Sequence, residues 1–133
     1  MSQENVEIIR KMYEGFTRAG PEGMLEFMHP EIDHRAIEGA PDDIGVFSGH
    51  DAMRRYYGQW VEMFDDFRAE VEELMEIGDR VVAVLHVIAR MKESEAEIDM
   101  RLGVVWTFRD SKAFSGREYA TREQALEAVG LRE

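Results

Sequence analysis

The stretch EIDMRLGVVWTFR, residues 97–109, decides the fold because its side chains alternate in character along the chain. Successive side chains of a β-strand point to opposite faces, so this alternation predicts a strand with one buried face. One set is mostly polar or small and includes Asp99, Arg101 and Thr107. The other set, which we expect to face the interior, is entirely apolar: Ile98, Met100, Leu102, Val104, Trp106 and Phe108.

The segments on either side of this strand predict an antiparallel meander. Residues 80–91, RVVAVLHVIARM, form a β-branched run, and residues 67–77 alternate up to the turn Gly78-Asp79. A last strand is predicted over residues 113–119, after the tight connection DSK. Short connections make successive strands antiparallel neighbours.

Helices are predicted before and after these strands. Apolar residues at helical spacing indicate helices over 3–18 and 51–64, with a short helix beginning at Pro21 between them. TREQ is a capping box that begins a C-terminal helix, and Gly130 is placed to end it. This order is typical of an α+β fold, in which a curved, mainly antiparallel sheet wraps its apolar face around the N-terminal helices.

The composition excludes several classes of protein. The chain has 133 residues, so we expect one domain, 1–133. Its net charge of −12 argues against binding to nucleic acid or to anionic membranes. It has no Cys, its four His lack the helical pair spacing of a metal site, and it has no phosphate loop. We expect no metal and no cofactor and, because no leader or membrane-spanning run is found, a cytoplasmic location.

The stretch EIDHRAIEG, residues 31–39, places Asp33 beside His34, which suggests half of a catalytic relay. A short extended segment is predicted here, so the two side chains should point to opposite faces. His34 then lies on the buried side with Ile32 and Ala36, whereas Asp33 is a solvent-facing charge near Arg35. The partner of His34 must come from elsewhere in the chain.

The order of elements and several phrases resemble the nuclear-transport-factor-2-like superfamily, in particular its SnoaL-like branch of polyketide-cyclase and ketosteroid-isomerase relatives. The phrases are NVEIIRKMYEGFTRAG, LEFMHPEIDHR, FSGHDAMRRYY, VVWTFRDSK and REYATREQALEAVGL, which cover essentially the whole chain. The resemblance implies a conical α+β barrel with a deep apolar pocket, usually dimerised through the outer sheet face. The superfamily includes isomerases, cyclases, dehydratases, epoxide hydrolases and proteins without chemistry, so the resemblance does not fix the function.

The resemblance places Tyr13 where the steroid isomerases of the superfamily keep a tyrosine that donates a hydrogen bond to the developing enolate. The catalytic base of those enzymes falls near Ala36, and the acid beside the tyrosine falls at Val104; neither residue ionises. Chemistry by the standard residues is therefore not predicted. The alternative is that Tyr13 is a core aromatic residue whose hydroxyl finds any partner.

By the family register, Phe114, Gly116 and Glu118 point inward. An inward carboxylate must be paired or neutralised, and His34 and Tyr13 are the plausible partners of Glu118. The resulting acid–base pair would be His34 and Glu118, with Tyr13 as hydrogen-bond donor. Two alternatives stay open: Glu118 could be a water-exposed residue at the pocket mouth, and His34 could replace an aromatic wall residue.

The expected pocket wall is mainly aromatic, and Gly116 would enlarge the cavity or admit close approach of a ligand. A filled core is the alternative. The expected ligand-binding residues are Phe16, Tyr57, Trp60, Val104, Trp106, Phe114 and Gly116.

His86 is predicted to lie on the outer sheet face, within an apolar strip made with Val82, Val84 and Ile88. An exposed strip of this kind favours a homodimer through the outer sheet face.

These observations together predict a soluble pocket protein for a small apolar or aromatic molecule. It would be an acid–base lyase, isomerase or cyclase-type enzyme. A non-catalytic ligand-binding protein and a dimerising accessory protein with a packed interior are the alternatives.

Overall fold

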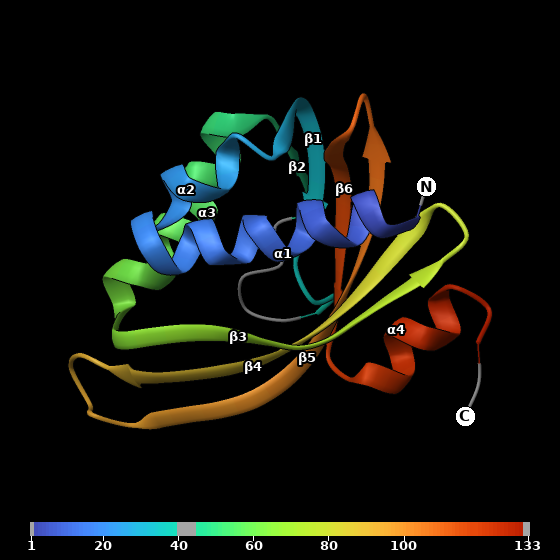
Figure 1. Ribbon diagram of the computed structural model, residues 1–133. Helices are drawn as coiled ribbons and strands as arrows, with labels where there is room; N and C mark the ends of the chain where they lie inside the picture. Colours follow the sequence, from blue (N-terminus) through green and yellow to red (C-terminus); the bar gives the residue numbers. More distant parts are fainter. Residues whose placement is uncertain (1, 40–44, 132–133) are drawn as a thin grey trace.

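The computed structural model describes residues 2–39 and 45–131, in which a curved six-stranded sheet partly encloses three helices (Figure 1). The predicted α+β class is confirmed. Two details differ from the prediction: a short extra strand, β2, follows β1, and Phe64 begins a strand instead of ending the third helix. The elements are α1 (Ser2–Ala19), α2 (Pro21–Leu25), β1 (Met28–Arg35), β2 (Val46–Ser48), α3 (His50–Met63), β3 (Phe64–Ile77), β4 (Arg80–Met91), β5 (Glu97–Arg109), β6 (Lys112–Tyr119) and α4 (Arg122–Ala128).

The strands lie in the order β2-β1-β6-β5-β4-β3. Strands β3 to β6 form the predicted antiparallel meander, and β1 joins it as a parallel neighbour of β6. Among the described residues β2 does not pair with β3, so the sheet is curved but does not close into a complete barrel. Helices α1 to α3 lie on one side of the sheet and α4 lies on the other (Figure 1).

The close contact between α1 and α2 depends on two glycines. A Cβ atom at Gly15 would lie 2.0 Å from the carbonyl oxygen of Gly23, and a Cβ atom at Gly23 would lie 2.0 Å from that of Gly15. Real Cβ atoms do not approach backbone so closely, so the two helices meet backbone to backbone. This contact fixes α1, whose residues Tyr13 and Phe16 face the interior.

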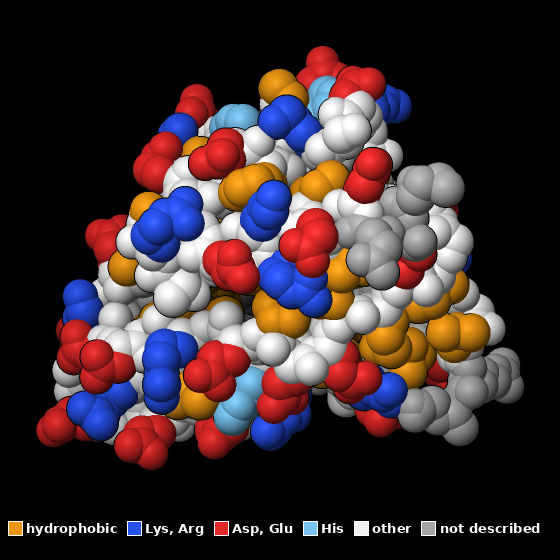
Figure 2. Space-filling view, in the orientation of Figure 1, with side chains coloured by type: hydrophobic (Ala, Val, Ile, Leu, Met, Phe, Trp, Pro, Cys, Tyr) orange, Lys and Arg blue, Asp and Glu red, His pale blue; other side chains and the backbone are white. Residues whose placement is uncertain are grey.

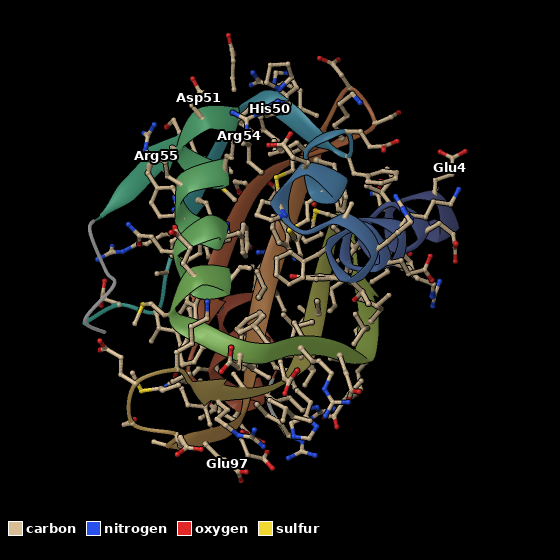
Figure 3. The ribbon with its side chains drawn as sticks, turned by 90° about the vertical axis from the view of Figure 1, so that its left-hand side faces the viewer. Glu4, His50, Asp51, Arg54, Arg55 and Glu97 are labelled. Atoms are coloured by element: carbon tan, nitrogen blue, oxygen red, sulfur yellow. The ribbon has the colours of Figure 1, made fainter. Side chains whose placement is uncertain are left out.

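Charged side chains spread over the visible surface, with acidic ones prominent (Figure 2), as the net charge of −12 requires. His50, Asp51, Arg54 and Arg55 lie in the first turns of α3, at the opposite end of the molecule from Glu97 on β5 (Figure 3). Arg54 pairs with Glu22 of α2 and with Asp51, and its guanidinium lowers the pKa of Glu22 below the ordinary value. The exposed Arg54–Glu22 pair joins α2 to α3, and it stabilises their contact only weakly.

The C-terminal helix begins and ends as predicted. The Thr121 hydroxyl accepts a hydrogen bond from the Gln124 amide at 3.0 Å, and Gly130 adopts a left-handed φ of 86° just after the helix. In return, the Gln124 side chain accepts a hydrogen bond from the Ala120 amide at 3.1 Å. Both ends of the helix are thus capped in the expected way.

The outer sheet face differs from the prediction of an exposed apolar strip. Val82 packs against Ala125 and Val129 of the C-terminal segment and is fully buried, and Val84 is only 2% exposed. His86 contacts the Asp99 carboxylate at 2.6 Å. The prediction failed because α4 covers this end of the face. A dimer through the rest of the face remains a prediction.

The first strand has the predicted alternation. Ile32 and His34 are fully buried and Ala36 is 1% exposed, whereas Asp33 and Arg35 lie on the opposite face. Asp33 accepts a hydrogen bond from Ser48 of β2, and Arg35 pairs with Glu38. The two members of the Asp33-His34 dipeptide therefore do not share a site. Within residues 2–39 and 45–131, no helix is long and apolar enough to cross a bilayer.

Candidate functional site

His34 and Glu118 meet in the interior, although they are 84 positions apart in the sequence. Strands β1 and β6 are parallel neighbours, with His34 beside Gly116 in the register, so Glu118 lies within reach along the same face. The distance from His34 Nε2 to Glu118 Oε2 is 2.7 Å. The His34 side chain is fully buried and that of Glu118 is 11% exposed. His34 was one of the two partners that the sequence suggested for Glu118, and the other was Tyr13.

A third residue, Tyr56 of α3, completes the polar contact. Its hydroxyl lies 3.1 Å from Glu118 Oε1 and 3.0 Å from Oε2, so it donates to the carboxylate across both oxygens. Tyr56 lies within the helix predicted over 51–64, but sequence reasoning assigned its side chain no role in the site. The available signal was weak: a tyrosine on a buried helix face needs a partner for its hydroxyl.

The surroundings of His34 favour one protonation state. Nδ1 is buried and has no hydrogen-bond partner among the described residues. A proton on Nδ1 would leave a buried N–H without an acceptor, which costs about 1–3 kcal/mol. Neutral His34 with its proton on Nε2 donates to Glu118 and leaves Nδ1 as an unpaired acceptor, which proteins tolerate better than an unpaired buried N–H. The ring is held by aromatic neighbours with centroids 5.5–6.0 Å away: Phe47, Tyr56, Tyr57 and Trp106.

A cavity of about 230 Å³ lies next to Glu118, so the interior is not packed shut. Helices α1 and α3 and strand β3 supply its aromatic wall: Tyr13, Phe16, Tyr56, Tyr57, Trp60 and Phe67. The sheet supplies an aliphatic wall that includes Leu85, Val87, Met100, Leu102 and Val104. Among the described residues, Glu118 is the only charged side chain that lines the cavity.

Four of the predicted wall residues line this cavity: Phe16, Tyr57, Trp60 and Val104. Trp106 does not; it is fully buried and its Nε1 donates to the Tyr13 hydroxyl at 3.2 Å. His34 itself lies behind Glu118 and outside the cavity wall. Of the predicted acid–base pair, only Glu118 can therefore touch a molecule in the cavity.

The role predicted for Gly116 was wrong. A Cβ atom at this position would lie 2.6 Å from His34 Nδ1 and 2.7 Å from Trp106 Cζ3. The missing side chain thus makes room for two buried rings and does not enlarge the cavity. Gly116 therefore lets the rings of His34 and Trp106 approach the backbone of β6 closely.

Phe114 also lies outside the cavity, because a β-bulge changes the register of β6. Thr107 pairs with Ser115, but Phe108 pairs with Ala113, so Ala113 takes the inward position and is fully buried. Phe114 instead packs against His29 with ring centroids 5.2 Å apart, and the Arg109 guanidinium lies 4.1 Å from its ring centroid. Simple alternation cannot predict such a bulge.

Two phenol groups remain available to a molecule in the cavity. Burial raises the pKa of Tyr13 and of Tyr57 above the ordinary tyrosine value, and the charge of Glu118 adds to both shifts. Both residues therefore keep their protons. Within the described part of the chain neither proton has an acceptor; Tyr13 contacts Trp106 and not Glu118. Each hydroxyl can donate to a carbonyl or hydroxyl group of a ligand.

Glu118 also lies at an opening. Together with Ile37 it lines both the inner cavity and a groove on the surface, where Arg35, Arg117 and Tyr119 are its neighbours. The carboxylate is therefore both paired inside and accessible at a mouth. Within residues 2–39 and 45–131, no group of three or more His, Asp or Glu side chains is arranged to hold a metal ion.

Comparison with known proteins is consistent with this geometry. A family model described as a SnoaL-like domain matches residues 9–115. The chain belongs to the SnoaL-like domain family. No curated protein matches it. Among solved structures, TerC co-crystallised with polyporic acid is 25% identical, with a TM-score of 0.77 over 96% of this chain and 99% of that one.

Two further solved structures are similar to this chain. An NTF2-like protein from Burkholderia xenovorans LB400 is 25% identical, with a TM-score of 0.77 and 98% of each chain covered. Bal32a, from a soil-derived mobile gene cassette, has a TM-score of 0.81 at 18% identity, over 96% of this chain and 97% of that one. At 18% identity, the similarity to Bal32a shows the fold alone.

Proposed function

We propose that this SnoaL-like protein binds a small, mostly apolar molecule in its cavity and that Glu118 exchanges a proton with the polar group of that molecule. The observation that carries the proposal is the position of Glu118. It is the only charged residue on the described wall, and His34 and Tyr56 hold it by hydrogen bonds of 2.7–3.1 Å. The 25% identity to TerC, which was co-crystallised with polyporic acid, supports a small-molecule ligand.

The roles of the individual residues follow from their contacts. Glu118 faces the ligand and acts as the acid or base. His34 and Tyr56 are positioning residues, because they touch the carboxylate and hold it toward the cavity. Tyr13 and Tyr57 donate hydrogen bonds to a carbonyl or hydroxyl group, and such donors stabilise negative charge that develops during a reaction.

The reaction class is an acid–base isomerase, lyase or cyclase type. The chain has Ala36 and Val104 at the two positions where the steroid isomerases keep their base and their acid, so neither position can exchange a proton. Glu118, on β6, must then donate or accept the proton. A non-catalytic binding protein is the second candidate, and it is favoured by the same two substitutions.

The first test is a binding screen of compact aromatic and alicyclic compounds, followed by calorimetry on the hits. Trp60→Ala removes an aromatic wall that is only partly buried. We expect it to weaken binding of any aromatic hit while the protein stays folded by circular dichroism. If Trp60→Ala instead unfolds the protein, Trp60 belongs to the core and the cavity wall has been misassigned.

The second test separates catalysis from binding. For any compound that is turned over, Glu118→Gln should lower the rate about a hundredfold or more, the usual size for a positioned proton-transfer group, while binding changes much less. His34→Ala should lower it too, and His34→Gln, which keeps an N–H donor, should restore part of the rate. Glu97→Gln, at an exposed position remote from the cavity, is the matched control. A rate that none of these changes affects would leave only the binding candidate.

A further inference from the structure

The charge of the cavity is unbalanced. Glu118 is the only charged side chain on its described wall, which contains no Lys, Arg or His. The two tyrosines that could in principle ionise stay neutral, as described above. No fixed positive charge therefore faces the carboxylate from the cavity side.

The two residues that hydrogen-bond to Glu118 do not balance its charge either. Tyr56 is a neutral donor, and His34 is neutral when its proton is on Nε2, because Nδ1 lies buried without an acceptor. These two donors stabilise a carboxylate by hydrogen bonds, but they add no positive charge. A buried charge without a partner of opposite sign is unfavourable, so a cationic group on the ligand would gain energy that a neutral one does not.

The aromatic wall also favours a cation. The ring of Phe16 lies 5.9 Å from that of Tyr57 and 5.7 Å from that of Phe67, and Trp60 lies 5.8 Å from Phe67. The faces of such rings carry partial negative charge and attract ammonium groups, most strongly where water is excluded. The net charge of −12 acts at longer range and concentrates cations near the protein.

We infer that the cavity selects its ligand by charge and takes a compact aromatic or alicyclic molecule with a basic amine, bound as ammonium to Glu118. Carboxylates and other anions are disfavoured inside the cavity, because they would lie beside Glu118 with no cation on the described wall; Arg35 and Arg117 line the surface groove outside it. The volume of about 230 Å³ lies below the usual range of ligand pockets, about 300–1,000 Å³, so the ligand must be small. The inference rests on the proposed function, in that the cavity must bind a small molecule at all.

The experiment compares probes that have the same shape but different charge. Benzylamine, benzyl alcohol and benzoate form one set, and 2-naphthylmethylamine, 2-naphthylmethanol and 2-naphthoate form a larger one. Dissociation constants are measured by calorimetry at neutral pH. We expect the amine of the better-fitting set to bind about tenfold more tightly than the alcohol, since a charge-assisted hydrogen bond is about twice as strong as a neutral one. The carboxylate should not bind.

Substitution of Glu118 tests whether its charge causes the preference for the amine. Glu118→Gln keeps the size of the side chain and removes the charge, so the advantage of the amine over the alcohol should disappear while the alcohol still binds. Glu97→Gln removes an exposed charge and should leave the advantage unchanged. This pair separates a contact in the cavity from a general effect of net charge.

The possible outcomes distinguish the two proposals. If the alcohol binds as tightly as the amine, or the carboxylate binds as well as either, the charge selection is wrong and the proposed function stands. If the preference for the amine survives in Glu118→Gln, Glu118 is not its cause and the inference fails. If no probe of either set binds, the inference fails, and the proposed function fails with it unless the first screen has given another apolar ligand.

Discussion

Substitution of Gly116 by Ala should destabilise the protein, against the usual effect of this change in a strand. Alanine normally stabilises such positions by about 0.5–1 kcal/mol relative to glycine. Here the added methyl would lie 2.6 Å from His34 Nδ1, 2.9 Å from its Cε1 and 2.7 Å from Trp106 Cζ3. Both rings are fully buried, so neither can move away freely. Overpacking of this kind costs about 1–3 kcal/mol, and we expect a value near 3.

The assay is urea unfolding of Gly116→Ala beside a matched control, Gly58→Ala. Gly58 lies within α3, and a Cβ atom there would meet nothing within 4 Å, so this change should stabilise the protein. At this chain length, a loss of about 3 kcal/mol corresponds to a melting temperature lower by roughly 10 °C. His34→Ala should reduce the cost of Gly116→Ala, because one of the two clashes disappears. If Gly116→Ala is as stable as Gly58→Ala, the rings do not lie against Gly116 and the argument is refuted.

Three other predictions follow from the structure. Burial raises the pKa of Tyr13 and Tyr57 above the ordinary 10.0, so above that pH the unfolded chain loses protons that the folded chain keeps. Stability should then fall by about 1.4 kcal/mol per pH unit for each, and Tyr13→Phe should reduce this slope in urea unfolding. Nitrogen NMR of His34 at neutral pH should show a proton on Nε2 and none on Nδ1; a protonated Nδ1 would overturn the tautomer assignment. Sedimentation should give a homodimer at micromolar concentration, and Arg101→Glu on the outer face should weaken it; a monomer would exclude the dimer.

Much of the fold could be predicted from alternation and spacing alone. The burial of Ile32 and His34, and the position of the partly exposed Asp33 on the opposite face, follow from a period of two. The capping of the last helix follows from Thr121 and Gln124. These features are local, because the residues that cause them are within a few positions of their effect. Local chemistry was sufficient in these cases.

The errors have a common cause, which is that they depend on contacts between distant segments. The bulge in β6 that turns Phe114 outward depends on how β5 and β1 pair with it. Gly116 looked like a gap in a wall because the sequence does not reveal that His34 and Trp106 fill the space beside it. Val82 looked exposed because nothing local indicates that the C-terminal helix covers it. Tyr56 was missed for the same reason, since its partner is 62 positions away.

The arrangement of the polar residues also limits where a proton can go. Under the proposed function, Glu118 gains or loses a proton, but His34 cannot pass it onward, because Nδ1 has no partner among the described residues. Tyr56 cannot do so easily either, since its hydroxyl already donates to both oxygens of the carboxylate. The proton must therefore return to the ligand or leave through the surface groove that Glu118 shares with Arg117. An isomerisation requires that the proton return to the same ligand. Loss of the proton to water through the groove would instead permit net elimination. The accessibility of Glu118 from the groove side therefore decides between these two reaction types.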